Sequence, residues 1–167
     1  HFFSPVQAMK LVELALMPDT PTDVGVALRH VMARMGKTVV EVAASPGYIV
    51  NRLLVPQLLA AIRALANGLA PVTAIDEAMK LGLGHPMGPL ALCDLIGLDI
   101  VFDMSRALYR ELGDPSYKAP ALLRRLVQDG SLGRKAGLGF YDYRTPERLP
   151  NPDLVALTTR PPVADAA

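Results

Sequence analysis

Residues 45–68, SPGYIVNRLLVPQLLAAIRALANG, decide the fold of this chain. The SPGY turn opens the segment, and from Ile49 to about Gly68 the pattern predicts a helix about 30 Å long. Because this helix is apolar almost all round, most of its surface must be covered by other helices or by a second subunit. Pro56 lies inside it and should kink it.

The residues before this helix predict a different kind of structure. HFF, MKLVELAL and KTVVEVAAS read as strands, and a helix that ends at Gly36 separates the second strand from the third. Neither face of MKLVELAL is polar, which is typical of a strand covered on both sides. Three strands and one helix would leave the edges of the sheet bare. We therefore expect residues 1–44 to be the end of an α/β domain whose first part lies outside this chain.

The residues after the long helix predict further helices at 73–81, at 88–112 with a bend at Gly97, and at 119–129. A glycine-rich segment with aromatic residues follows, and the prolines and alanines beyond Arg144 are typical of a loose tail. The predicted fold class is thus mainly α. We expect a short β-β-α-β segment over 1–44, a helical domain over 45–144 and a flexible tail over 145–167.

Composition excludes several classes of function. The 167 residues carry a formal net charge of +1, from 17 Lys+Arg and 16 Asp+Glu, so no charge-driven nucleic-acid surface is expected. Cys93 is the one cysteine, which rules out an internal disulfide and favours a reducing, cytoplasmic setting with a small buried thiol. No stretch reaches the roughly 20 apolar residues of a membrane span. We expect no nucleic-acid or membrane partner.

No stretch predicts a phosphate-binding loop or a metal site. The runs GLGHPMG (82–88) and GLGF (137–140) lack the G-x-G-x-x-G spacing and do not lie between a strand and a helix of a β-α-β unit. The histidines are isolated, with no pair four residues apart. We therefore assign no cofactor-binding or metal-binding residue. We expect His30 to be a surface residue and His85 to be structural.

A histidine and a glutamate remain as candidates for chemistry. Glu13 lies in an apolar strand, where a carboxylate is costly to bury unless a charged or hydrogen-bonding partner meets it. An imidazole suits that role, because a carboxylate at one ring nitrogen makes the other nitrogen a better base. The short connection SPVQA (4–8) allows His1 to lie beside Glu13. The alternative is that His1 is a remnant of a purification tag and that Glu13 reaches solvent.

Asn51 is the third polar candidate. It falls in the first turn of the long apolar helix, where a side-chain amide and free backbone donors are able to bind an oxygen-bearing ligand. The equally good alternative is a capping hydrogen bond to its own loop.

Four motifs occur together in the order and at the spacing of a known family, that of the L-3-hydroxyacyl-CoA dehydrogenases, and the resemblance covers about residues 1 to 143. They are HFFSPVQAMKLVE (1–13), SPGYIVNRLLVPQL (45–58), AIDEAMKLGLGHPMGPLALCDLIGLD (74–99) and GRKAGLGFYDY (133–143). Any one motif alone would be a weak indication, whereas the four in order are specific.

The resemblance implies a Rossmann domain followed by a helical domain, of the 6-phosphogluconate dehydrogenase C-terminal-like kind, that makes a homodimer. It implies oxidation of the 3-hydroxyl of an acyl-CoA substrate to a ketone, or the reverse, with NAD as hydride carrier. The family's catalytic histidine falls on His1, the glutamate that orients it on Glu13, and the asparagine that holds the substrate oxygen on Asn51. The NAD site is implied to lie mostly in residues before His1.

Three places depart from the family's pattern. Ser4 stands where an asparagine close to the base is usual, so hydrogen bonding around His1 changes and Ser4 becomes a candidate substrate-binding residue. Residues 44–48 read Ala-Ser-Pro-Gly-Tyr where Asp-x-Pro-Gly-Phe is common, which removes a charge and adds the hydroxyl of Tyr48. Ala136 stands where serine or threonine is common.

These observations predict the C-terminal portion of an oxidoreductase of the 3-hydroxybutyryl-CoA type, acting in fatty acid metabolism and β-oxidation. Without a site for the hydride acceptor, the chain by itself should be inactive. Two alternatives stay open. One is a stand-alone, non-catalytic helical dimerisation module, and the other is a hydroxy-acid or sugar-acid dehydrogenase of the same fold.

Overall fold

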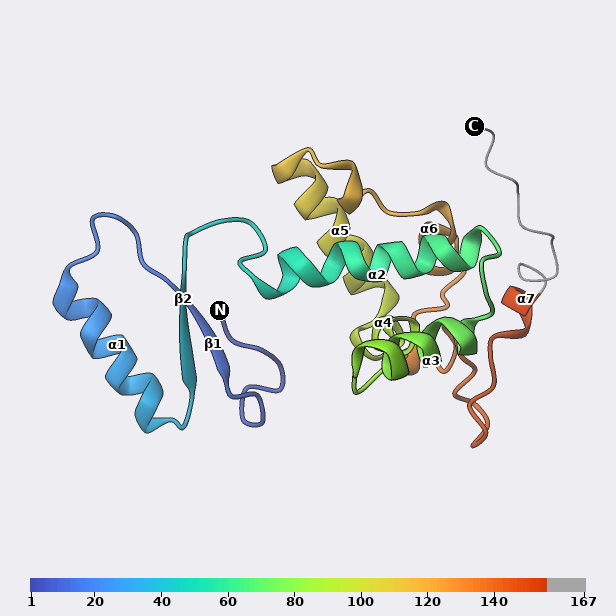
Figure 1. Cartoon of the computed structure of the whole chain (residues 1–167), viewed down its shortest axis with the longest axis horizontal. Helices are drawn as coiled ribbons and strands as arrows, with labels where there is room; N and C mark the ends of the chain where they lie inside the picture. The colour runs from blue at the N-terminus through green and yellow to red at the C-terminus, as the bar shows by residue number, and fades with distance from the viewer. Residues whose placement is uncertain (156–167) are drawn as a thin grey trace. The chain divides into compact units, whose positions relative to one another are not determined.

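The computed structural model describes residues 1–155, which divide into two compact units, residues 1–52 and the residues from Leu53 onward (Figure 1). Most of the predicted tail, residues 156–167, lies outside the described residues. In chain order the elements are β1 (Leu11–Ala15), α1 (Thr22–Arg34), β2 (Thr38–Val42), α2 (Val50–Ala66), α3 (Val72–Leu83), α4 (Pro89–Ile96), α5 (Leu98–Leu112), the 3₁₀ turn Pro115–Tyr117, α6 (Ala121–Gln128), the 3₁₀ turn Arg134–Ala136 and α7 (Pro152–Val155).

The predicted fold class, mainly α with a short α/β segment at the start, is confirmed. In the first unit β1 and β2 pair in parallel, from Leu11 opposite Thr38 to Ala15 opposite Val42. Helix α1 connects the two strands and lies beside them, which makes a β-α-β crossover (Figure 1). The strand predicted at HFF is reduced to a single antiparallel bridge between Phe2 and Val12.

The second unit is built on α2, which continues as a helix through Pro56. Its buried side chains form one stripe that belongs to the core of the unit: Val55, Leu58, Leu59, Ile62 and Leu65. The other helices of the unit complete this core, so the apolar helix predicted from the sequence is covered along that stripe. Cys93, on α4, is fully buried as expected, and burial raises the pKa of its thiol well above the ordinary value.

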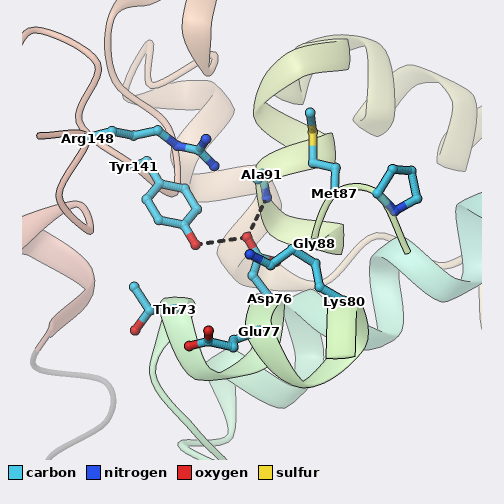
Figure 2. Close-up of a pocket in the computed structure, with 10 residues that line it drawn as sticks. Thr73, Asp76, Glu77, Lys80, Met87, Gly88, Ala91, Tyr141 and Arg148 are labelled. Atoms are coloured by element: carbon cyan, nitrogen blue, oxygen red, sulfur yellow. Dashed lines mark hydrogen bonds between the residues drawn. The ribbon is translucent and has the colours of Figure 1, made fainter. Parts of the chain in front are cut away.

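Two buried aspartates tie the glycine-rich segment 133–143 to the helices. Asp76, on α3, accepts hydrogen bonds from the backbone N–H groups of Leu90 (2.7 Å) and Ala91 (3.0 Å) at the start of α4 and from the Tyr141 hydroxyl (2.8 Å), as Figure 2 shows in part. Asp94, on α4, accepts from the N–H groups of Phe140 and Tyr141, both at 2.9 Å, and from the Tyr143 hydroxyl at 3.1 Å. The four bonds from Phe140, Tyr141 and Tyr143 fix the segment in place, and the two from Leu90 and Ala91 hold the start of α4 against α3.

Two glycines allow this close packing. A Cβ atom on Gly88 would lie 2.2 Å from Cβ of Asp76, and one on Gly139 would lie 2.0 Å from Oδ1 of Asp94. Both distances are far below van der Waals contact, so a side chain at either position would displace the carboxylate. Gly88 of GLGHPMG and Gly139 of GLGF therefore have a packing role.

The first residues of the predicted tail differ from expectation. Asn151 donates its side-chain amide to the Gly139 carbonyl at 2.7 Å, and its backbone N–H to the Phe140 carbonyl at 2.9 Å. Leu154, on α7, is almost completely buried in the core of the second unit. Residues 149–154 therefore pack against the glycine-rich segment, where the Asp142 N–H also donates to the Leu149 carbonyl at 2.8 Å. Within residues 1–155, none of the helices is long and apolar enough to cross a membrane.

Candidate active site

Backbone pairing brings the first histidine and the glutamate of β1 together. The His1 nitrogen donates to the Glu13 carbonyl at 2.8 Å, and the Glu13 N–H donates to the His1 carbonyl at 3.1 Å. Residues that exchange both bonds lie directly opposite each other on an antiparallel pair, with their side chains on one face and Cβ atoms about 5 Å apart. The extended segment that precedes SPVQA thus places His1 across from Glu13.

The two side chains meet in a short hydrogen bond. Nδ1 of His1 lies 2.6 Å from Oε2 of Glu13; the glutamate is 1% exposed and the imidazole 25% exposed. A carboxylate accepts, so the bond assigns the ring proton to Nδ1 and leaves the lone pair on Nε2. The alternative in which Glu13 reaches solvent is wrong, because its carboxylate is buried.

The second oxygen of Glu13 is held by the first turn of α2. Oε1 accepts hydrogen bonds from the backbone N–H groups of Ile49 (3.0 Å) and Val50 (2.9 Å). These donors stand at a helix N-terminus, where free N–H groups and the helix dipole favour an anion. With three donors on its two oxygens, the carboxylate cannot rotate without breaking a bond, so it is a fixed acceptor for His1.

Two aromatic rings flank the imidazole. Phe3 lies with its centroid 4.6 Å from that of His1 at an interplanar angle of 53°, and Tyr48 stacks on it at 5.2 Å and 21°. Neither ring was expected from the sequence as a neighbour of the histidine. Their positions 3 and 48 are far apart in the chain, and only the turn before α2 brings Tyr48 back to the strand.

The other two candidates are less tightly placed. Asn51 is half-buried in the first turn of α2, directly after the two residues that bind Glu13, and its side-chain amide makes no hydrogen bond to any residue within 1–155. The described residues therefore give no support to the capping alternative, and the amide is available to a ligand. Ser4 is exposed and has no hydrogen bond to His1 or Glu13.

The arrangement is chemically suited to accept a proton. Nε2 of His1 has no partner among residues 1–155, and the ring is accessible to solvent. A neutral imidazole with a carboxylate behind it accepts a proton from a hydroxyl, and the positive charge that forms faces Glu13. Of the other histidines, His30 is exposed on α1 and His85 is half-buried. No group of three histidine, cysteine or carboxylate side chains in the described part of the chain is placed to bind a metal.

The second unit has a hollow of about 290 Å³ between α3, α4 and the glycine-rich segment (Figure 2). Asp76, Lys80, Tyr141 and Arg148 are among the residues that line it. The carboxylate of Asp76 is already used by its three donors, and burial, followed by the charge of Asp76, raises the pKa of Tyr141 far above its ordinary value. None of the residues proposed for chemistry lines this hollow.

Family models match nearly the whole described chain in two parts. A model described as "3-hydroxyacyl-CoA dehydrogenase, NAD binding domain" matches residues 1–45, and one described as "3-hydroxyacyl-CoA dehydrogenase, C-terminal domain" matches residues 47–143.

Individual relatives agree with these matches. A 3-hydroxybutyryl-CoA dehydrogenase of Clostridioides difficile is 48% identical over 143 residues, which are 86% of this chain and 51% of the relative. A probable 3-hydroxybutyryl-CoA dehydrogenase of Bacillus subtilis (strain 168) is 47% identical over 143 residues, which are 86% of this chain and 50% of the relative. The crystal structure of (S)-3-hydroxybutyryl-CoA dehydrogenase from Ralstonia eutropha matches with a TM-score of 0.82 and 45% identity, over 87% of this chain and 51% of that one. The chain spans about half the length of the curated relatives it matches.

Proposed function

This chain belongs to the 3-hydroxyacyl-CoA dehydrogenase family, and from that premise we propose that it is the C-terminal portion of an oxidoreductase that interconverts (S)-3-hydroxyacyl-CoA and 3-ketoacyl-CoA with NAD. The observation that carries the proposal is the pair of His1 and Glu13, with its 2.6 Å hydrogen bond and an Nε2 that has no partner among residues 1–155. The relatives named as 3-hydroxybutyryl-CoA dehydrogenases favour a short-chain substrate.

In the proposed reaction, His1 is the general base. Nε2 takes the proton of the 3-hydroxyl group while the hydrogen on the same carbon departs with its electron pair, and the C–O bond becomes a carbonyl. NAD supplies the acceptor for that hydride. Glu13 does not change protonation; it holds the imidazole in the required tautomer and offsets the imidazolium charge. In the reverse direction the imidazolium returns the proton to the carbonyl oxygen.

The amide of Asn51 is proposed to hold the substrate oxygen near Nε2. It lies in the same helical turn as the two N–H groups that bind Glu13, so its backbone is fixed relative to the acceptor of the dyad. Ser4 is proposed as a second substrate-binding residue, which contributes a hydroxyl from the connection after the first bridge. Both assignments predict a larger effect on KM than a change at the exposed His30 would have.

The dinucleotide is proposed to be held mainly by residues outside this chain. Residues 1–45 match an NAD-binding model, yet the connection from β1 to α1, residues 16–21, contains no glycine and so does not provide the phosphate loop of a β-α-β unit. No residue of this chain is assigned to NAD. We also propose a division into an NAD-domain end over 1–44 and a substrate domain over 45–144.

We further propose that the helical domain makes a homodimer and that the enzyme acts in the cytoplasm. Large apolar side chains that remain exposed on α2 and α3, at Leu53, Leu81 and Leu83, support the homodimer.

The test uses a protein that joins this chain to a dinucleotide-binding half like that of the relatives. With 3-hydroxybutyryl-CoA and NAD as substrates, His1→Gln should lower kcat by about 10²–10⁴-fold and change KM little. His30→Gln, at an exposed histidine of α1, is the matched control and should keep the kcat of the parent protein. Equal kcat values for His1→Gln and His30→Gln would contradict the proposal.

Two further assays separate the alternatives. The 167-residue chain alone, given acetoacetyl-CoA and NADH, should show no turnover, and robust turnover would contradict the missing dinucleotide site. A panel of CoA thioesters and free hydroxy acids should show activity only with the thioesters. Activity with free acids would favour the hydroxy-acid alternative, and none with either class would favour the dimerisation module.

A further inference from the structure

Tyr48 makes two different contacts with the two members of the dyad. Its ring stacks on the imidazole of His1, with centroids 5.2 Å apart and planes 21° from parallel. Its peptide group leads directly into the two N–H groups, of Ile49 and Val50, that bind Oε1 of Glu13. The side chain of Tyr48 therefore contacts the His1 ring. Its backbone positions the Ile49 and Val50 N–H groups that donate to Glu13.

The backbone of Tyr48 is held in an unusual conformation. Its φ is +47°, in the left-handed region that residues other than glycine, asparagine and aspartate rarely adopt. The surrounding turn fixes it: the Tyr48 N–H donates to the Ser45 carbonyl at 3.0 Å, and Arg52 donates its backbone N–H to Gly47 at 3.1 Å and its guanidinium to the Ser45 hydroxyl at 2.6 Å. A left-handed residue just before α2 turns the chain so that the next two N–H groups reach Glu13.

The imidazole needs such a support. The backbone holds the ring through Cβ and the bond to Glu13 holds it at Nδ1, so the contacts on its two faces restrain the rotation about χ1 and χ2 that remains. Tyr48 lies nearly parallel to one face, and Phe3 meets the ring at 53° and 4.6 Å. Because the Tyr48 hydroxyl makes no hydrogen bond within residues 1–155, the contact depends on the aromatic ring itself.

We propose that Tyr48 is a positioning residue that holds the His1 imidazole against Glu13 and keeps Nε2 aimed at the substrate hydroxyl. This inference rests on the proposed function for its effect on turnover, and on the geometry alone for its effect on the histidine. A base displaced by less than an ångström loses much of its rate advantage, so the ring of Tyr48 acts on kcat.

The test compares variants that separate the ring from the backbone. Tyr48→Phe keeps the ring and should retain kcat within about two-fold. Tyr48→Asn removes the ring but tolerates the left-handed backbone, and it should lower kcat by about ten-fold or more with KM within about two-fold. Tyr48→Gly also accommodates the backbone and serves if the asparagine variant does not fold. Tyr109→Asn, at an exposed tyrosine of α5, is the matched control.

A spectroscopic readout makes the test independent of activity. In protein labelled with ¹⁵N, the Nδ1 proton of His1 should give a downfield resonance in the parent and in Tyr48→Phe, and this resonance should broaden or shift in Tyr48→Asn and Tyr48→Gly. Parental kcat or an unchanged resonance in the asparagine and glycine variants would overturn the inference. If the parent itself does not oxidise 3-hydroxybutyryl-CoA, the proposed function fails, and the resonance alone decides the role of Tyr48.

Discussion

Glu13 in the first unit and Asp94 in the second are bound in nearly the same way. Each carboxylate is 1% exposed, and each accepts hydrogen bonds from the N–H groups of two consecutive residues, 49 and 50 for Glu13 and 140 and 141 for Asp94. The third donor differs. Glu13 binds the partly exposed imidazole of His1, whereas Asp94 binds the hydroxyl of Tyr143.

The identity of this third donor distinguishes a site suited to proton transfer, at Glu13, from a purely structural hydrogen-bond cluster, at Asp94. Burial, followed by the charge of Asp94, raises the pKa of Tyr143 to about 12, so the phenol keeps its proton and acts as a permanent donor. An imidazole has a second nitrogen, which is able to take up and release a proton while the first stays bound. Two backbone N–H groups thus hold either carboxylate, and its side-chain partner sets what it does.

Substitution of Glu13 should have the largest effect on catalysis. In Glu13→Gln the remaining side-chain oxygen still accepts from Ile49 and Val50, but the amide now donates to Nδ1 of His1 and moves the ring proton to Nε2. The base is lost, and kcat with 3-hydroxybutyryl-CoA should fall by about 10²–10⁴-fold. Steady-state kinetics on the joined protein measure this. Asp94→Asn, assayed in parallel, should keep kcat within about three-fold if it folds; a similar loss in both variants would remove the distinction.

Asp94 should instead govern stability. Asp94→Ala leaves three donors without an acceptor, two buried backbone N–H groups and the half-buried Tyr143 hydroxyl. The free energy of unfolding should fall by about 3–5 kcal/mol, as measured by urea denaturation. Asp94→Asn should lose less, because an amide oxygen still accepts from Phe140. If the free energy of unfolding fell by less than about 1 kcal/mol in Asp94→Ala, the hydrogen bonds of Asp94 would contribute little to stability.

The sequence predicted the elements of this fold well, because hydrophobic periodicity and glycine positions mark where they begin and end. The cost of burying a carboxylate in an apolar strand left the His1–Glu13 contact as one of two alternatives, and the resemblance of HFFSPVQAMKLVE to the family decided in its favour. The same argument applies to LALCDLI (90–96), where Asp94 is the one charged residue in an apolar run. The N–H groups that complete both sites were not predictable, since Ile49 and Phe140 are ordinary apolar residues whose backbones happen to meet a distant carboxylate.

The buried charge of Asp94 also predicts a pH dependence. Burial raises the pKa of this carboxyl from its ordinary value of 3.8 to about 6, and its hydrogen-bond donors offset only part of that rise. The folded protein therefore binds the proton more tightly than the unfolded chain does. As the pH rises from about 4 to about 6, Asp94 should lower the free energy of unfolding by up to about 3 kcal/mol, and no further above that range.

The measurement is the difference in unfolding free energy between the parent protein and Asp94→Asn at several pH values. The advantage of the parent should shrink as the pH rises through this window. Asp142 does not interfere, because Arg144 lowers its pKa to about 2 and it titrates below the window. If the difference in unfolding free energy between the two proteins were constant from pH 4 to 7, the hydrogen-bond donors would fully offset the effect of burial on the pKa of Asp94. Asp94 would then be ionised across this whole range.

The smallest effects test whether close packing is needed to bring donors to Asp94. Gly139→Ala would put a Cβ 2.0 Å from Oδ1 of Asp94, so the carboxylate must move away from Phe140, and the free energy of unfolding should fall by about 1–3 kcal/mol. Gly82→Ala is the matched control, since no atom lies within 4 Å of its added Cβ and the residue is inside α3. It should raise stability by about 0.5–1 kcal/mol, because alanine loses less backbone entropy in a helix than glycine does.

Opposite signs for the two substitutions in one thermal denaturation series would show that the space beside the carboxylate, rather than backbone freedom, is what Gly139 provides. If both variants were stabilised, the N–H groups of residues 140 and 141 would tolerate a shifted Asp94 carboxylate. Glu13 and Asp94 would then share the number of their hydrogen bonds but not the need for an exact position.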